Sequence, residues 1–97
     1  MLHHAVLYRL KPGVTLDRVR AAREALAALA EHLPGVLHFA VTDNLASENA
    51  GYTLALFAVF ETKDAYEIFG RHPEVRHVVA ELLNPIVEKK IVALGES

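Results

Sequence analysis

The sequence predicts an α+β fold of the ferredoxin-like kind, in which one four-stranded antiparallel sheet carries its helices on a single face. Segments with the patterns of strand, helix, strand, strand, helix and strand follow one another, which is the order of the split βαβ arrangement. Hydrophobic residues make up 53% of only 97 residues, more than a chain this short can easily bury within itself. We expect a single domain over residues 1–97.

The first half of the chain provides a strand, a helix and a second strand. Leu2–Leu10 reads as a strand that ends at a Lys-Pro-Gly turn, residues 11–13. Thr15 can cap a helix whose apolar residues recur at helical spacing as far as Leu33. Pro34 and Gly35 end this helix, and residues 36–42 form a second, short strand.

After a polar loop over residues 43–51, the second half of the chain again provides a strand, a helical region and a strand. Residues 52–61 are the strongest strand, because apolar side chains occupy both of its faces and both must therefore be covered. Thr62 can cap a short helix over residues 63–69 that Gly70 interrupts, and Pro73 opens another helix that reaches about Leu83. An Asn-Pro pair stops it, and residues 86–94 form the last strand.

The face of the sheet opposite the helices is also expected to be apolar. Alternation along the strands places Phe57 and Val59 there together with Ala5 and Leu7. Packing this face against a second copy of the chain would remove it from water, and a two-fold homodimer is the commonest arrangement that does so. The sequence therefore predicts a homodimer as its main partnership.

Composition argues against several classes of function. The net charge is −2 and the basic residues are scattered, which is unlike a nucleic-acid-binding protein. No cysteine is present, and no histidine or carboxylate spacing on a helix suggests a metal site. The five glycines stand singly, so no phosphate-binding loop and no nucleotide cofactor is implied; we expect no cofactor at all. Without a membrane-length apolar run or a secretory signal, a cytoplasmic location is expected.

Three segments together carry a family resemblance. They are MLHHAVLYRLKPG at residues 1–13, the Gly51-Tyr52-Thr53 entry to the third strand, and FGRHP at residues 69–73. In this order they resemble the stress-responsive A/B barrel (Dabb) domain family, and the resemblance covers essentially the whole chain. It implies a dimeric α+β barrel, in agreement with the homodimer inferred from the apolar strand faces.

The resemblance also implies where a functional site would lie. A plant branch of the family performs an aldol cyclisation of a linear polyketide without a cofactor, and its strand-initial, cleft-lining histidine matches His4. At three further polar positions of that cyclase the present sequence has Leu54, Phe69 and Val75. Because its histidine positions hold Leu54 and Val75 instead, the comparison argues against cyclase activity and leans towards a protein that is not an enzyme.

His4 is therefore the one candidate for a catalytic side chain. Its imidazole could act as a general base or hydrogen-bond a ligand near neutral pH; the alternative is a core histidine that a protein group satisfies. Tyr8 lies on the same strand face and could contact a flat or oily ligand. The predicted ligand cleft comprises His4, Tyr8, Leu54, Phe69 and Val75.

Three functions remain open at this point. The first is a homodimer that binds a small apolar molecule in an internal cleft. The second is a cofactor-independent enzyme, a cyclase, isomerase or monooxygenase that uses His4 with Tyr8. The third is a structural or partner-binding module. A cavity that reaches His4 would favour the first two, because ligand sites usually occupy ~300–1,000 Å³, and a filled core would favour the third.

Overall fold

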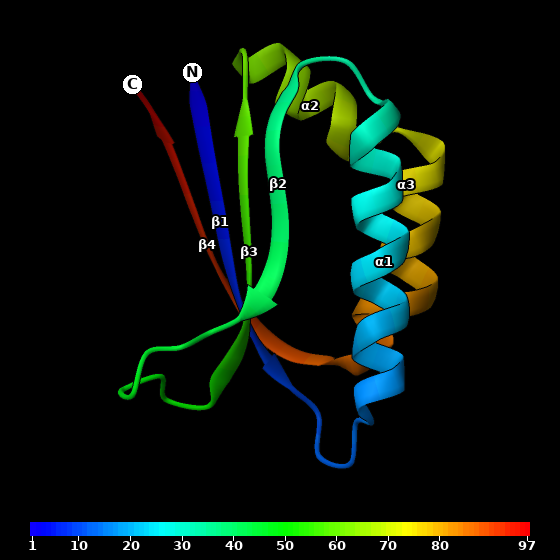
Figure 1. Cartoon of the computed structure of the whole chain (residues 1–97), viewed down its shortest axis with the longest axis vertical. Coiled ribbons are helices and arrows are strands. Elements are labelled where there is room, and N and C mark those ends of the chain that lie inside the picture. The colour runs from blue at the N-terminus through cyan, green and yellow to red at the C-terminus, as the bar shows by residue number, and fades with distance from the viewer.

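Four antiparallel strands form one sheet, and every helix lies on the same side of it (Figure 1). The computed structural model describes residues 1–97. In space the strands follow the order β2-β3-β1-β4, so the first strand of the chain is central. Their bounds are β1 Leu2–Leu10, β2 Val36–Asp43, β3 Tyr52–Phe60 and β4 Val87–Glu96. The predicted ferredoxin-like α+β fold is confirmed.

The helices begin where the capping residues predict. Helix α1, Leu16–His32, follows Thr15, whose hydroxyl oxygen accepts a hydrogen bond of 3.3 Å from the backbone N–H of Arg18. Helix α2, Lys63–Arg71, is capped in the same way by Thr62, and helix α3, Pro73–Val78, by the imidazole of His72. Each side chain satisfies a backbone N–H that the first helical turn leaves unpaired. None of the helices is both long and apolar enough to span a membrane.

Two expected boundaries were wrong. Gly70 does not interrupt the helix that contains it, since α2 continues to Arg71; a single exposed glycine lowers helix stability but does not end a helix. After α3 the chain widens into a π-helical turn, η1 Val79–Leu83, followed by a 3-10 turn, η2 Asn84–Ile86. Pro85 has no N–H to donate, so α-helical hydrogen bonding cannot continue through it, and β4 begins one residue later than predicted.

The core lies between the helices and one face of the sheet. Strand β3 turns every second residue towards the helices, and Phe60 is the most central of these, with 1% of its surface exposed. Its ring lies 5.4 Å from the ring of Tyr66 and 5.5 Å from that of Phe69, both on α2. These aromatic contacts attach α2 to the sheet and fix the position of its inner side chains.

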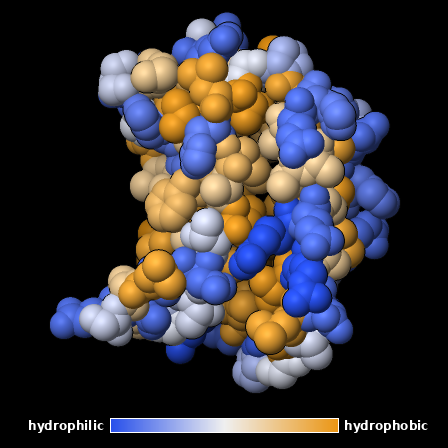
Figure 2. All heavy atoms as spheres, viewed as in Figure 1, coloured by the Kyte–Doolittle hydropathy of each residue, from blue (hydrophilic) through white to orange (hydrophobic).

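The other face of the sheet carries no helix, and we call it the open face. Strand register places Ala5 opposite Phe57 and Ala93, and Leu7 opposite Ala55 and Ile91, which confirms that these side chains share one face. Phe57 remains 45% exposed and Ile91 51% exposed. In Figure 2, apolar atoms run along the left edge of the molecule, on the side away from the helices. Proteins in water rarely leave such a continuous apolar surface uncovered.

Candidate functional site

A cleft of about 270 Å³ lies between the helices and the helix-facing side of the sheet. Sixteen residues line it and twelve of them are hydrophobic. Strand β1 forms part of its floor through His4, Val6 and Tyr8, which share a face because side chains alternate along a strand. Helix α2 and the turns after α3 form the opposite wall. A mainly apolar cleft with a few polar groups is the usual form of a small-molecule site.

Most of the residues predicted to form a cleft lie in this one. His4, Tyr8, Phe69 and Val75 all line it. Leu54 does not: it faces the helices but is buried in the core beside the cleft. Sequence reasoning missed two polar lining residues, Asn84 and Lys90. Asn84 reaches the cleft from the turn η2, and Lys90 reaches it through the register between β1 and β4. Neither feature is easily predicted from sequence.

His4 stands in the floor with its ring against an aromatic partner and not against a hydrogen-bond acceptor. The ring centroids of His4 and Tyr66 are 5.0 Å apart in a T-shaped arrangement. Burial lowers the pKa of His4 below 6.5, and the positive charge of Lys90 lowers it further. The imidazole is therefore neutral near pH 7, with one ring nitrogen able to donate a hydrogen bond and the other able to accept one.

Tyr8 is the second polar group in the floor. Its side chain is 5% exposed, and its hydroxyl forms no hydrogen bond with another residue. Burial raises the pKa of Tyr8 to about 12, so the hydroxyl stays protonated at physiological pH. Its oxygen is not among the fully buried atoms that lack a partner, so it can be reached from the cleft. A hydroxyl without a protein partner on the wall of a cleft is thus available to a bound molecule.

A second concavity, of about 360 Å³, lies on the open face among Ala5, Phe57, Val59 and Ala93. It is a shallow depression in one side of the sheet, without helices to enclose it, and it belongs to the surface predicted to meet a second copy. His3 borders it and is already hydrogen-bonded to the hydroxyl of Ser97 at 2.8 Å. We therefore take the enclosed cleft as the candidate site. No group of three His, Asp or Glu side chains is arranged to hold a metal ion.

The lowered pKa of His4 predicts how stability depends on pH. Between the folded-state pKa and 6.5, the unfolded chain binds more protons at this residue than the folded chain. The contribution of His4 to the free energy of unfolding is fully present above pH 6.5. It decreases as the pH falls, until His4 is protonated in the folded chain as well. Urea denaturation from about pH 7.5 to about pH 5 should show a smaller decrease in His4→Gln than in the wild type. The same substitution at His77, which is exposed on α3, is the control. Equal pH dependence of His4→Gln and wild type would contradict the prediction.

Comparison with protein families gives a match to the stress responsive A/B barrel domain, Dabb, over residues 2–93. No curated protein matches the sequence.

Several solved structures share the fold. A dimeric ferredoxin-like protein of unknown function from Thermobifida fusca is 23% identical, with a TM-score of 0.85 over 99% of this chain and 90% of that chain. A Dabb family protein from Mesorhizobium loti is 20% identical, with a TM-score of 0.83 over 99% and 95%. A hydroxynitrile lyase from Passiflora edulis is 18% identical, with a TM-score of 0.85 over 97% and 90%. At these identities the similarity establishes the fold.

Proposed function

Because this chain belongs to the stress-responsive A/B barrel domain family, we propose that it acts as a homodimer in which each protomer binds a small apolar molecule in the cleft between its sheet and its helices. One observation carries the proposal: an apolar cleft in which the hydroxyl of Tyr8 and the imidazole of His4 have no hydrogen-bond partner in the protein. A bound molecule would gain both the burial of its apolar surface and these hydrogen bonds.

The open face supports the homodimer. Its central positions are apolar, and Phe57 and Ile91 are each about half exposed in the single chain. Two antiparallel sheets can pack face to face at ~10 Å and bury such side chains between them. The related protein from Thermobifida fusca is described as dimeric, which is consistent with this use of the face. The cleft lies on the other side of the sheet, so pairing through the open face leaves it free.

The chemistry of the wall favours binding over catalysis. The family resemblance aligns Phe69 and Val75 with polar positions of the cyclase branch, and both line the cleft here as apolar side chains. A general base needs an orienting group and a substrate within hydrogen-bond reach. His4 has an aromatic neighbour in place of an orienting acceptor. The lyase from Passiflora edulis shares the fold, but nothing in this cleft assigns that reaction to the present chain.

Removing the Tyr8 hydroxyl tests the proposal. Tyr8→Phe should weaken binding of 1-naphthol, a neutral fluorescent probe, about tenfold, since losing one partner of a buried hydrogen bond costs roughly 1–2 kcal/mol. The melting temperature should hardly change, because the hydroxyl has no partner in the protein. His4→Ala should also weaken binding and leave the dimer intact.

The matched control is Tyr52→Phe, which removes a hydroxyl outside the cleft and should leave affinity unchanged. Affinity follows from fluorescence titration and stability from thermal denaturation. Failure of the wild type to bind 1-naphthol, together with native mass spectra showing no co-purifying molecule, would contradict the proposal. So would loss of stability with unchanged affinity in both cleft variants.

A further inference from the structure

Lys90 gives the cleft a charge preference, and we propose that the ligand of the cleft is a small apolar carboxylic acid whose carboxylate is held between Lys90 at the rim and Tyr8 in the floor. This inference rests on the proposed binding function and specifies the chemical class of the molecule. It depends on the charge content of the lining, the position of Lys90 in the sheet, and the polar groups near it that lack partners.

The lining contains one basic lysine side chain and no acidic one. Lys90 is that lysine, and the remaining polar members are His4, Tyr8, Tyr66 and Asn84. Twelve of the sixteen lining residues are hydrophobic, so the charge stands at the edge of an apolar volume. A cationic ligand would find no counter-ion in this lining, whereas an anionic one would.

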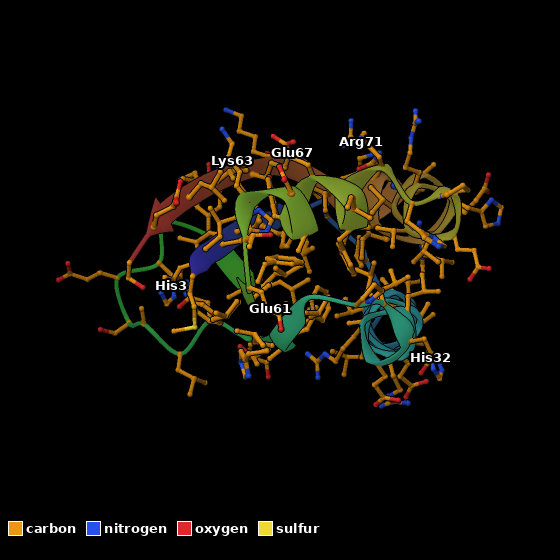
Figure 3. The ribbon with its side chains drawn as sticks, turned by 90° about the horizontal axis from the view of Figure 1, so that it is seen from above. His3, His32, Glu61, Lys63, Glu67 and Arg71 are labelled. Carbon is orange, nitrogen blue, oxygen red and sulfur yellow. The ribbon has the colours of Figure 1, made fainter.

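No acidic residue of the chain forms an ion pair with Lys90. Figure 3 shows Glu67 between Lys63 and Arg71 along one side of α2, pointing outward from the helix. Glu88, two residues before Lys90, lies 3.7 Å from the guanidinium of Arg9. No carboxylate lies within 4.0 Å of the Lys90 ammonium. Its charge is therefore not neutralised by the protein.

Strand register brings Lys90 to one of the two polar groups of the floor. Lys90 lies directly opposite Tyr8 on the neighbouring strand, so both side chains project from the same face of the sheet. Its positive charge also contributes, after burial, to the lowered pKa of His4, which lies four residues from Tyr8 along β1. A protonated phenol and an ammonium can both donate hydrogen bonds. Donors gathered around a positive charge suit a carboxylate, whose oxygens only accept.

The cleft volume restricts the size of the apolar body. About 270 Å³ lies just below the usual range for ligand sites, which fits a body of one or two rings or a short chain. The apolar part would lie against side chains such as Phe69 and Val75, farther from the rim than the acid group.

A matched pair of probes tests the preference. 1-Naphthoate and 1-naphthamide have the same ring system and nearly the same shape, but only the first carries a negative charge. The wild type should bind 1-naphthoate about twofold to fivefold more tightly, as expected for a charge-assisted hydrogen bond to an exposed lysine. In Lys90→Met this ratio should fall to about one, while the affinity for 1-naphthamide stays unchanged.

Lys63→Met is the control, because it removes a lysine from the outer side of α2 and should leave the ratio intact. Isothermal titration calorimetry at low and high salt gives both affinities, and added salt should reduce the preference in the wild type alone. Equal wild-type affinities for the two probes would overturn the acid preference and leave the proposed binding function standing. An equal decrease of the ratio in both lysine variants would assign it to overall charge and overturn the role of Lys90. Absence of binding by either probe would count against the binding function itself.

Discussion

Replacing Phe57 with glutamate is expected to convert the proposed dimer into monomers. Phe57 lies at the middle of the open face, between Ala5 on β1 and Ala40 on β2, and has 45% of its surface exposed in the single chain. In a dimer paired through this face, the new carboxylate would be removed from water without a counter-ion, which costs several kcal/mol. Two-fold symmetry would place this cost on both protomers.

Light scattering should give about twice the 10.7 kDa chain mass for the wild type at micromolar concentration, and about the chain mass for Phe57→Glu. Because Phe57 does not belong to the core between sheet and helices, the variant should keep its far-ultraviolet circular dichroism. Leu16→Glu is the control: Leu16 is 79% exposed in the first turn of α1, on the helical side, and its replacement should leave the mass at the dimer value. A wild-type mass of 10.7 kDa would refute the dimer.

Gly35→Ala is expected to destabilise the fold strongly, for two reasons that can be separated. Gly35 has φ +80°, a conformation that costs a residue with a Cβ about 1–2 kcal/mol. In addition, a Cβ on Gly35 would lie only 2.5 Å from the Cβ of Ala65 on α2. Because that atom is bonded directly to the helix backbone, α2 itself would have to move, which adds about 1–3 kcal/mol.

Gly13 is a matched control for this experiment. Its φ is +79°, and no atom lies within 4 Å of the position that a Cβ would occupy, so Gly13→Ala carries the conformational cost alone. Urea denaturation should show the larger loss for Gly35→Ala. The double variant Gly35→Ala/Ala65→Gly should lose less stability than the sum of the losses of the two single variants. Removing the Cβ of Ala65 relieves the clash, so the two changes are not additive. Equal losses for Gly35→Ala and Gly13→Ala would show that α2 does not restrict this position.

The sequence was sufficient for the fold because its local signals agree with one another. Thr15, Thr62 and Pro73 mark three helix starts, and the structure confirms all three. Alternation along β3 also indicated which residues share a face. Because both of its faces are apolar, the strand was expected to be covered on both sides. The errors lie at helix ends, where packing outweighs propensity: Gly70 stays helical, and the residues before Pro85 form a wider turn than periodicity predicts.

The candidate site was harder to predict. His4 and Tyr8 could be placed on one strand face from alternation alone, and both line the cleft. Lys90 could not, because its approach depends on which residue of β4 lies opposite Tyr8, and a shift of one residue would turn its side chain to the open face. Leu54 follows the same alternation as its neighbours but lies where the sheet and helices are closely packed. Local patterns therefore predict the face of a residue, but its distance from the cleft depends on tertiary packing.

The central position of β1 has a consequence for the order of folding. Its two neighbours are β3 and β4, and Leu2 pairs with Phe60 on one side and Glu96 on the other. During synthesis, β2 and β3 can form a hairpin across the loop between them, while β1 stays without one partner until the ribosome has produced β4. Such long-range pairing gives a high contact order and slow formation of the sheet. We therefore expect an early species in which the strand bearing His4 and Tyr8 is paired on one side only, and in which its apolar residues are available to chaperones.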